Sequence, residues 1–283
     1  FTDELSPEGQ VHTWIGQFHQ GVVEQMYDNR VILVLHMSCP VYCRFCFRKA
    51  MVGPDGEGTL TPEALTQALG YIVTRPEIWE VIVTGGDPFM LSAARAGALA
   101  GRLGAIPHVR VVRWHTRMPV ADPERVTDSY ASAITASRKP TWLAVHVNHP
   151  RELTDEARAA FARLRAAGVN LVSQSVLLKG VNDDVETLEA LFRELTAAGV
   201  KPYYLHHLDR APGTAHFRVP LEQGRAIVEA LRARLSGLAL PTYVLDIPGG
   251  AGKALASEPQ VVRDGEAWRA QGIDGEWREY REE

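Results

Sequence analysis

The stretch Cys39-Pro-Val-Tyr-Cys43-Arg-Phe-Cys46 contains all three cysteines of this 283-residue chain. The cysteines are spaced C-x3-C-x2-C, and an aromatic residue, Phe45, precedes the last of them. Directly upstream, Val31-Ile-Leu-Val-Leu35 is a short apolar run of the kind that forms a buried strand. The cysteines are therefore predicted to lie on a loop at the carboxyl end of the first strand, which is where α/β barrels place their chemistry.

Three cysteines at this spacing fit few kinds of site. Thiolates bind zinc ions and iron–sulfur clusters. A structural zinc site needs four ligands, so zinc here would require a histidine in addition. A disulfide framework is disfavoured because the cysteine count is odd and the spacing is tight. The spacing favours a four-iron cluster with one iron left open to bind a small molecule, with zinc or plain reactive thiols as the alternatives.

Around this loop, apolar runs that resemble strands alternate with amphipathic segments that resemble helices. Strands are predicted at 31–35, 81–84, 109–114, 142–147, 170–177, 202–207 and 242–245, and helices at 61–74, 92–103, 123–137, 154–167, 185–198 and 221–235. Such alternation predicts a parallel sheet with helices outside it. Six units without a break in composition predict an α/β fold, an open and partial (β/α)6 barrel.

The two ends of the chain depart from this pattern. Residues 1–26 are predicted to include a short amphipathic helix over one end of the barrel. Its apolar positions are Trp14, Ile15, Phe18, Val22 and Val23. We therefore divide the chain into a helical packing segment at 1–26, the barrel at 27–240 and a C-terminal segment at 241–283, whose charged tail is expected on the surface.

Composition argues against several classes of function. Hydrophobic residues make up 46% of the chain, enough for one large core, and the net charge of −4 gives no basic surface for nucleic acid. No apolar run reaches 18 residues, so no membrane span is expected. No secretory signal is visible, and a start at Phe1 leaves a missing N-terminal piece open. Cysteines confined to one motif fit a reducing, cytoplasmic location.

Two glycine-rich stretches are candidate binding loops. Gly85-Gly-Asp87 ends the strand at 81–84, and glycines there let a ligand or another backbone approach closely, although an ordinary tight turn would look the same. Pro248-Gly-Gly-Ala-Gly-Lys253 is not a phosphate-binding P-loop, because the spacing G-x4-G-K-[ST] fails. Its lysine could form a Schiff base with a carbonyl cofactor such as pyridoxal phosphate (PLP), or be a solvated surface charge.

Together these stretches resemble the radical S-adenosylmethionine (SAM) enzymes and, among them, the PLP-dependent lysine 2,3-aminomutases. The cysteine loop after a first strand is similar to the radical SAM signature, and Pro-Gly-Gly-x-Gly-Lys is similar to the PLP-binding motif of the aminomutases. The resemblance runs from about Tyr27 to Lys253. Further matching stretches follow in the family's order: Tyr27-x-x-Arg30, Thr84-Gly-Gly-Asp87, Asn148-His-Pro150, Gln174-Ser-Val-Leu-Leu-x-Gly-Val-Asn182 and His216-Phe-Arg218.

The resemblance implies cofactor-binding roles for ten residues. The ligands of a [4Fe-4S] cluster, whose open iron chelates SAM, would be Cys39, Cys43 and Cys46. The residues that meet the amino group of SAM would be Gly85, Gly86 and Asp87. Lys253 would be the catalytic lysine that forms the Schiff base with PLP. The positions that match residues near PLP are Tyr27, Arg30 and Gln174.

The resemblance also implies a substrate site. Arg48 matches the arginine that pairs with the substrate carboxylate, a role that suits a planar guanidinium. Asp209 and Asp246 match the two acidic residues that hold the remote amino group of lysine. An uncharged substrate would leave both carboxylates unpaired, at a cost of at least roughly 1–3 kcal/mol. A turn or helix-cap role is the alternative for either aspartate.

The predicted function is therefore an isomerase, a 2,3-aminomutase that moves the α-amino group of a basic amino acid by way of a 5'-deoxyadenosyl radical. L-Lysine is the first choice of substrate. Residues 205–217 also resemble the shorter branch that makes (R)-β-lysine for elongation factor P, so arginine, ornithine and glutamate stay open. The implied partners are this amino acid and a reductant such as flavodoxin or ferredoxin. No nucleic acid or membrane is expected, and a homo-oligomer is left open.

Two rival functions stay open at this point. One is a radical SAM enzyme that acts on a peptide or RNA without PLP. The other is a zinc or iron–sulfur binding module with no enzymatic activity. The lysine loop and the absence of a fourth cysteine argue against the second.

Overall fold

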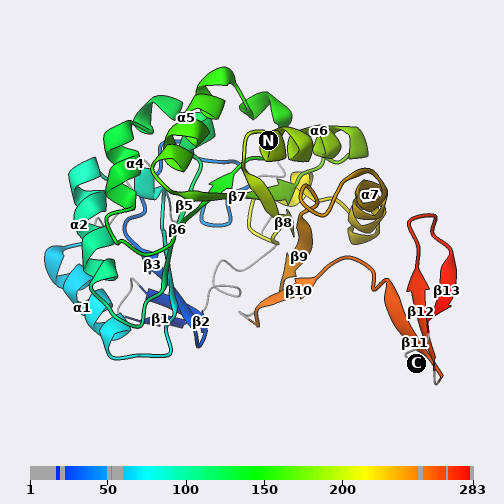
Figure 1. Cartoon of the computed structure of the whole chain (residues 1–283), viewed down its shortest axis with the longest axis horizontal. Coiled ribbons are helices and arrows are strands. Elements are labelled where there is room, and N and C mark those ends of the chain that lie inside the picture. The colour runs from blue at the N-terminus through cyan, green and yellow to red at the C-terminus, as the bar shows by residue number, and fades with distance from the viewer. Residues whose placement is uncertain are drawn as a thin grey trace.

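The computed structural model describes residues 17–19, 23–49, 52, 60–247, 251–265 and 267–280. Its centre is a ten-stranded sheet in which the strands from β3 to β9 run parallel in sequence order. These strands are β3 (Arg30–Val34), β4 (Glu80–Thr84), β5 (Val111–Thr116), β6 (Thr141–His146), β7 (Asn170–Leu177), β8 (Lys201–His207) and β9 (Thr242–Asp246). The sheet curls into an open barrel with the helices outside it (Figure 1). This architecture confirms the predicted partial (β/α)6 barrel.

One outer helix follows each of the strands from β3 to β8. The helices are α1 (Pro62–Val73), α2 (Ala93–Gly104), α4 (Asp128–Ile134), α5 (Asp155–Ala166), α6 (Val185–Ala197) and α7 (Leu221–Arg234). The helix predicted at 123–137 is wrong in its first turns. That stretch contains a 3-10 turn, η3 (Pro123–Arg125), after the short α3 (Met118–Ala121). The side chain of Thr127 then caps a new helix by accepting a hydrogen bond from the Tyr130 N–H (3.1 Å), which delays the start of α4.

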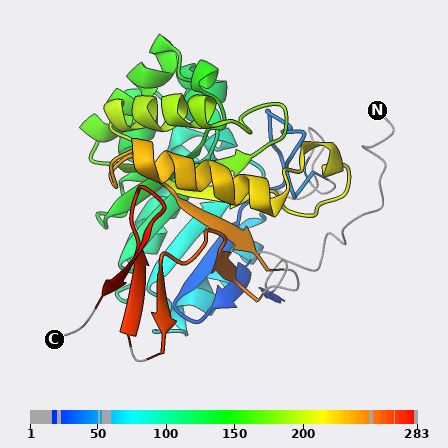
Figure 2. The same ribbon diagram turned by 90° about the vertical axis from the view of Figure 1, so that its right-hand side faces the viewer.

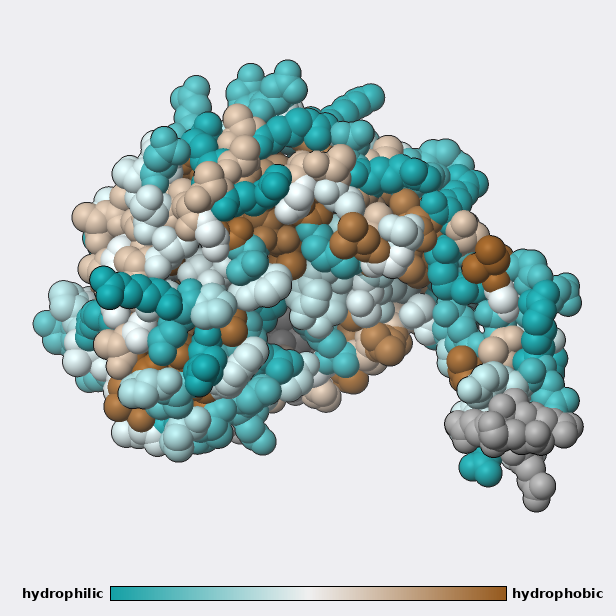
Figure 3. All heavy atoms as spheres, viewed as in Figure 1, coloured by the Kyte–Doolittle hydropathy of each residue, from teal (hydrophilic) through white to brown (hydrophobic). Residues whose placement is uncertain are grey.

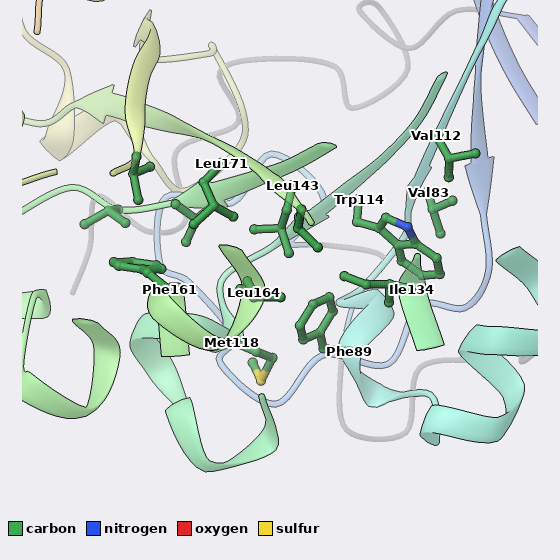
Figure 4. Close-up of a cluster of buried hydrophobic side chains, with 14 of the residues drawn as sticks. Val83, Phe89, Val112, Trp114, Met118, Ile134, Leu143, Phe161, Leu164 and Leu171 are labelled. Atoms are coloured by element: carbon green, nitrogen blue, oxygen red, sulfur yellow. The ribbon is translucent and has the colours of Figure 1, made fainter. Parts of the chain in front are cut away.

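The hydrophobic core lies between the outer face of the sheet and the helices. Figure 4 shows Trp114, Leu143 and Leu171 of neighbouring strands pointing toward Phe161 and other helix residues, and all are buried. Because side chains alternate along a strand, the intervening positions face the inside of the barrel. Near the carboxyl ends of β5, β6 and β7 these inner positions carry His115, His146 and Gln174, so this end of the interior offers polar groups to a ligand.

Both edges of the sheet carry antiparallel strands. β1 (Gln17–His19) and β2 (Val23–Tyr27) precede β3, and β10 (Lys253–Leu255) pairs with β9. The helix predicted around Phe18 and Val23 is therefore wrong, since both residues lie in strands. Tyr27 pairs with Arg30 across a two-residue turn, and pairing with the barrel edge outweighs the local helical periodicity. The other apolar positions of that prediction lie outside the described residues.

A small second sheet follows the barrel. Its antiparallel strands are β11 (Val261–Asp264), β12 (Ala267–Gln271) and β13 (Trp277–Tyr280). The sheet stands beside the barrel near α7 in both ribbon views and forms the lobe at the right of the space-filling view (Figures 1, 2 and 3). The sequence indicated only a charged surface tail there.

Three short 3-10 turns complete the described elements: η2 (Pro88–Met90), η4 (Pro150–Glu152) and η5 (Ala215–Phe217). All three follow the carboxyl ends of barrel strands. In the described part of the chain, no helix has the length and apolar character needed to cross a membrane.

Candidate active site

The three cysteines lie on the loop that leaves β3, as the sequence predicted. The loop turns tightly around them, because the Cys46 N–H donates to the Cys43 carbonyl (3.0 Å) and the Lys49 N–H donates to the Cys46 carbonyl (3.0 Å). All three thiols are free and partly buried. They are close enough for their charges to interact. The loop therefore presents three sulfur ligands as one group.

This group fits an iron–sulfur cluster better than a single metal ion. Within the described residues, no three His, Cys, Asp or Glu side chains converge as ligands of one ion. A cluster has no such need, since each thiolate binds a different iron. Burial raises the pKa of the Cys46 thiol to about 11 and also raises that of Cys43. The thiolate forms are thus costly without a cation beside them, which iron would supply.

Arg117 and Glu152 contact the cysteine loop from the neighbouring strands. Arg117 follows β5, and its guanidinium donates to Cys43 Sγ (2.8 Å) and to Glu152 Oε2 (2.7 Å). Glu152 Oε1 in turn accepts from the backbone N–H groups of Asn148 (2.8 Å) and His149 (3.0 Å). Arg117 is thereby held against a predicted cluster ligand. From the sequence, Arg117 at a strand end fits a structural hydrogen bond or a cofactor contact equally well, whereas Glu152 has no such signal.

Gly85, Gly86 and Asp87 pack directly beneath the cysteine loop. The Gly86 N–H donates to the His36 carbonyl (2.6 Å), and the Asp87 N–H donates to the Ser38 carbonyl (3.1 Å). A Cβ on Gly86 would lie 1.9 Å from the Ser38 carbonyl oxygen, so no larger residue fits. The glycines therefore let two backbones approach each other.

The Asp87 carboxylate points into the protein and is 3% exposed. It accepts hydrogen bonds from Thr116 Oγ1 (2.7 Å) and from the backbone N–H groups of Phe89 (2.9 Å) and Arg117 (2.9 Å). Burial raises its pKa to about 6. The observed role of Asp87 is to fix the loops around the cysteines, and a direct contact between this motif and SAM stays a prediction.

A cavity of about 470 Å³ opens beside Cys43. Its walls include Phe45, Arg117, Asn148, Glu152 and Val181, from the cysteine loop and the loops after β5, β6 and β7. The Asn148 side chain belongs to this wall, and its buried Nδ2 has no hydrogen-bond partner that meets the geometric criteria, although it lies near His146. A cavity with apolar walls and such a donor, next to a cluster ligand, fits a small organic cofactor that binds the open iron.

Lys253 lies at the opposite edge of the sheet. The sequence placed it on a glycine loop, whereas the structure makes it the first residue of β10, directly opposite Asp246 in the β9–β10 pairing. The Lys253 N–H donates to the Tyr27 hydroxyl (3.1 Å), and the Arg30 guanidinium lies over the Tyr27 ring (3.5 Å). The structure thus brings together three of the four residues predicted near PLP, and it joins the two edges of the barrel there. Residues 248–250 of this motif lie outside the described residues.

The two predicted substrate carboxylates lie beside this lysine. Asp246 Oδ1 accepts a hydrogen bond from Lys253 Nζ, and Asp246 Oδ2 lies 3.3 Å from His206 Nδ1. These contacts lower the pKa of Asp246, against the effect of burial. Burial and the nearby Asp246 raise the pKa of Asp209 to about 7. The helix-cap alternative fails for both, because neither is among the caps of the described helices and Asp246 ends β9.

Histidines and Gln174 line the interior between the two groups. His146 on β6 pairs in register with Gln174 on β7, so both side chains point the same way. His115 on β5 has a buried Nε2 without a hydrogen-bond partner. Burial lowers the pKa of His115 and His146, so both are neutral near pH 7. An unused imidazole nitrogen close to Lys253 fits a polar cofactor or substrate in the barrel. The sequence left these histidines between structural and binding roles.

Arg48 lies on the cysteine loop and is 5% exposed. Its backbone N–H contacts the Cys46 thiol, and its guanidinium lies 4.9 Å from the Phe47 ring centroid. Gln174 and Arg48 are not in direct contact with Lys253 in the described hydrogen bonds. The structure therefore groups the site into a cysteine end and a lysine end, with the polar interior between them.

Comparisons with known proteins show the family of this chain. The model of the radical SAM superfamily matches residues 33–192. A protein of Aquifex aeolicus is 40% identical over 255 residues, which cover 90% of this chain and 69% of that protein. The L-lysine 2,3-aminomutases of Haemophilus influenzae and Clostridium subterminale are 38% and 39% identical, over 82% and 83% of this chain and 68% and 56% of those proteins.

Solved structures share the fold. A radical SAM methyltransferase from Sphaerobacter thermophilus superposes with a TM-score of 0.59 at 21% identity, covering 83% of this chain and 73% of that one. The superfamily match spans more than half of this chain, and it includes the cysteine loop and the strands that carry the interior residues. The chain therefore belongs to the radical SAM superfamily and, within it, to the family of the L-lysine 2,3-aminomutases.

Proposed function

We propose that this protein is a SAM- and PLP-dependent 2,3-aminomutase whose substrate is L-lysine. Membership of the radical SAM superfamily implies a [4Fe-4S] cluster and SAM. The observation that supports the rest is the grouping of Lys253 with Asp246 and Asp209. One amine suits a carbonyl cofactor, and two carboxyl groups beside it suit a substrate with a remote ammonium group.

The chain's own residues divide the work between two ends of the barrel. Cys39, Cys43 and Cys46 would hold the cluster, and the cavity beside Cys43 would bind SAM. Lys253 would hold PLP, with Tyr27 and Arg30 beside it. When bound, SAM at a reduced cluster supplies a carbon radical that removes hydrogen, and PLP supplies the conjugated ring that carries the migrating nitrogen. The barrel positions these groups and keeps water away from them.

Substrate recognition uses charge at both ends of the amino acid. Arg48 would bind the α-carboxylate, since a buried guanidinium favours a planar anion. Asp209 and Asp246 would bind the remote ammonium. A neutral side chain would leave two partly buried carboxyl groups without a cation, so lysine is favoured over uncharged amino acids.

Product formation under anaerobic conditions tests this proposal. The protein is reconstituted with iron, sulfide, PLP, SAM and a reductant, and L-lysine, L-arginine, L-ornithine and L-glutamate are offered separately. We expect β-lysine, identified by mass and retention time. Asp209→Asn and Asp246→Asn should each lower kcat/KM for lysine by roughly 30-fold or more, because each leaves a charge without its partner.

Asp155→Asn is the matched control, because Asp155 is exposed at the start of α5 and should leave kcat/KM unchanged. Conversion of glutamate alone would contradict the proposed roles of Asp209 and Asp246 in substrate binding, but it would still agree with an aminomutase. Formation of deoxyadenosine without any amino-acid product would contradict the aminomutase itself.

A further inference from the structure

Asp246 has a cation partner within the protein. Its Oδ1 accepts from Lys253 Nζ, and the side chains of Asp246 and Lys253 are 19% and 32% exposed, so the carboxylate is partly shielded from water while the lysine remains open to it. The pairing is built into the fold, because Lys253 and Asp246 are opposite each other in the β9–β10 hairpin. The same carboxylate is the one proposed to bind the substrate ammonium. Two cations therefore compete for one carboxylate.

The charges around this ion pair are unequal. Asp209 interacts with both Asp246 and Lys253, so one lysine ammonium faces two carboxyl groups. Among the described residues, the other titratable groups close to the pair are His206 on β8, at 3.3 Å from Asp246, His115 on β5, and Tyr27, whose hydroxyl accepts from the Lys253 N–H. Arg30 lies over the Tyr27 ring, and no ion pair between it and either carboxyl group is found among the described contacts. Burial lowers the pKa of both histidines, so they add no positive charge near pH 7. Lys253 is thus the cation on which both carboxyl groups depend.

Attachment of a carbonyl cofactor would consume the Lys253 amine: the ammonium releases a proton to water, the free amine adds to the carbonyl carbon, and the carbonyl oxygen leaves as water when the C=N bond forms. Lys253 then no longer offers Asp246 a free ammonium. We propose that Asp246 is a shared counter-ion, which pairs with Lys253 until this amine is taken by the cofactor and with the remote ammonium of the substrate afterwards. This inference rests on the proposed function and adds an order of events, in which the cofactor is attached before the substrate binds. The substrate's cation site is blocked before the cofactor is attached and becomes available through the attachment.

Thermodynamic linkage makes the coupling mutual. If loss of the lysine charge favours binding of the substrate ammonium, a bound ammonium favours attachment of the cofactor to the same degree. His206 is the positioning residue of this exchange, because its contact with Oδ2 holds the carboxylate while Oδ1 changes partner. The attachment releases one proton and one water molecule and needs no oxidant or reductant.

Binding of 6-aminohexanoate to the cofactor-free protein tests the proposal. This probe has the carboxylate and the remote ammonium of lysine but lacks the α-amine. Calorimetry compares the wild type with Lys253→Met, Lys253→Gln and Lys253→Arg. We expect the two neutral variants to bind the probe roughly tenfold more tightly than the wild type or more, because the competing cation is gone. Lys253→Arg keeps the charge and should bind as weakly as the wild type.

Three controls make the result specific. Hexanoate, which lacks the ammonium, should show no gain in the neutral variants. Adding Asp246→Asn to Lys253→Met should abolish the gain. Lys139→Met removes a lysine just before β6, at the opposite end of the barrel, and should behave as the wild type. Thermal melts of each variant establish that it is folded.

Equal affinity of the wild type and the neutral variants for the probe would overturn the shared counter-ion. A gain that survives Asp246→Asn would place the ammonium elsewhere and overturn it as well, as would the absence of binding to every variant. These outcomes are separable from failure of the proposed function, which product formation by the reconstituted enzyme decides.

Discussion

The carboxyl group of Asp209 is partly buried beside a second carboxylate. Its pKa rises from 3.8 to about 7, chiefly because burial disfavours the charged form and secondly because Asp246 repels it. Between these two pH values the folded protein retains a proton that the unfolded chain has released. The contribution of Asp209 to the stability of the cofactor-free protein therefore falls as the pH rises from about 4 to about 7 and stays low above pH 7.

Because ionisation of Asp209 lowers the stability, Asp209→Asn should be stabilising at high pH. The amide cannot ionise, so the variant should melt higher than the wild type at pH 8, by roughly 3 °C or more, and at nearly the same temperature at pH 4.5. Thermal denaturation of the cofactor-free proteins at both pH values measures the difference. A lower melting temperature for the variant at pH 8 would show that ionised Asp209 stabilises the fold. Stability gained here should be accompanied by the loss of activity predicted above.

Single residues were predictable from sequence where chemistry and spacing both restrict them. The cysteine loop met that condition, and so did Lys253. Lys253 follows Asp246 by seven residues, and the pairing of β9 with β10 explains this spacing, because it places the two residues opposite each other. Asp87 did not, because nothing in the sequence shows that its carboxylate points inward. His206 was one of several histidines at strand ends, and its contact with Asp246 depends on the register of β8 against β9.

At the scale of elements, the contact between the loop after β4 and the loop after β3 depends on one glycine. A Cβ on Gly86 would lie 1.9 Å from the Ser38 carbonyl oxygen and 2.4 Å from its carbon, both backbone atoms that cannot rotate away. Gly86→Ala must therefore displace the segment that leads into Cys39. We expect the variant to bind less than half of the iron of the wild type after reconstitution and to melt several degrees lower.

Gly101→Ala is the matched control for this prediction. Gly101 lies in α2, and apart from its chain neighbours and the adjacent backbone of its own helix, no atom lies within 4 Å of the position that an alanine Cβ would take there. Alanine should therefore leave iron content unchanged and stabilise the helix by up to about 1 kcal/mol. Iron per chain and melting temperature are the two measurements. If Gly86→Ala keeps full iron content, the contact between the two loops does not position the cysteines.

Helices and strands could be predicted from the sequence where the apolar pattern was long and where the strand that each one packs against or pairs with came next in the chain. β3 to β9 and most outer helices satisfy this condition. The N-terminal strands do not, because their few apolar residues fit a helix as well as a strand. Hydrogen bonding to the edge of the barrel decides in favour of the strand. Asp28-Asn29 just before the apolar run at 31–35 was a turn signal that could have corrected the prediction.

At the scale of the whole molecule, strand–helix alternation predicted the curled sheet, while the three-stranded sheet at the C-terminal side had no comparable signal. Its strands are short and charged, and none of its described residues is buried. What holds it together is local, such as the cation–π contacts between Arg263 and Trp268 (6.0 Å) and between Arg269 and Trp277 (5.8 Å). Strands held together by such contacts have little alternation of apolar and polar residues, so the sequence gives no clear signal for them.

The small sheet is attached to the barrel through α7. Its described contacts with α7 are polar: Arg225 with Glu258, Gln260 Nε2 with Glu229 Oε2 (3.0 Å) and Arg232 Nη2 with the Gly272 carbonyl (3.1 Å). Exposed or half-buried polar pairs of this type stabilise a fold by only about 1 kcal/mol each. A chain ended after Ser257 should therefore fold, melt within roughly 5 °C of the full chain and bind PLP equally well.

A chain ended after Ile247 is the contrasting variant. It also removes β10, and with it Lys253 and the buried Ala256, whose N–H donates to the Tyr243 carbonyl (3.0 Å). This variant should lose PLP binding and melt clearly lower than the first. Thermal melts and PLP absorbance separate the two, because the first cut removes only surface contacts while the second opens the edge of the barrel. Loss of PLP from the chain ended after Ser257 would instead make the small sheet part of the site.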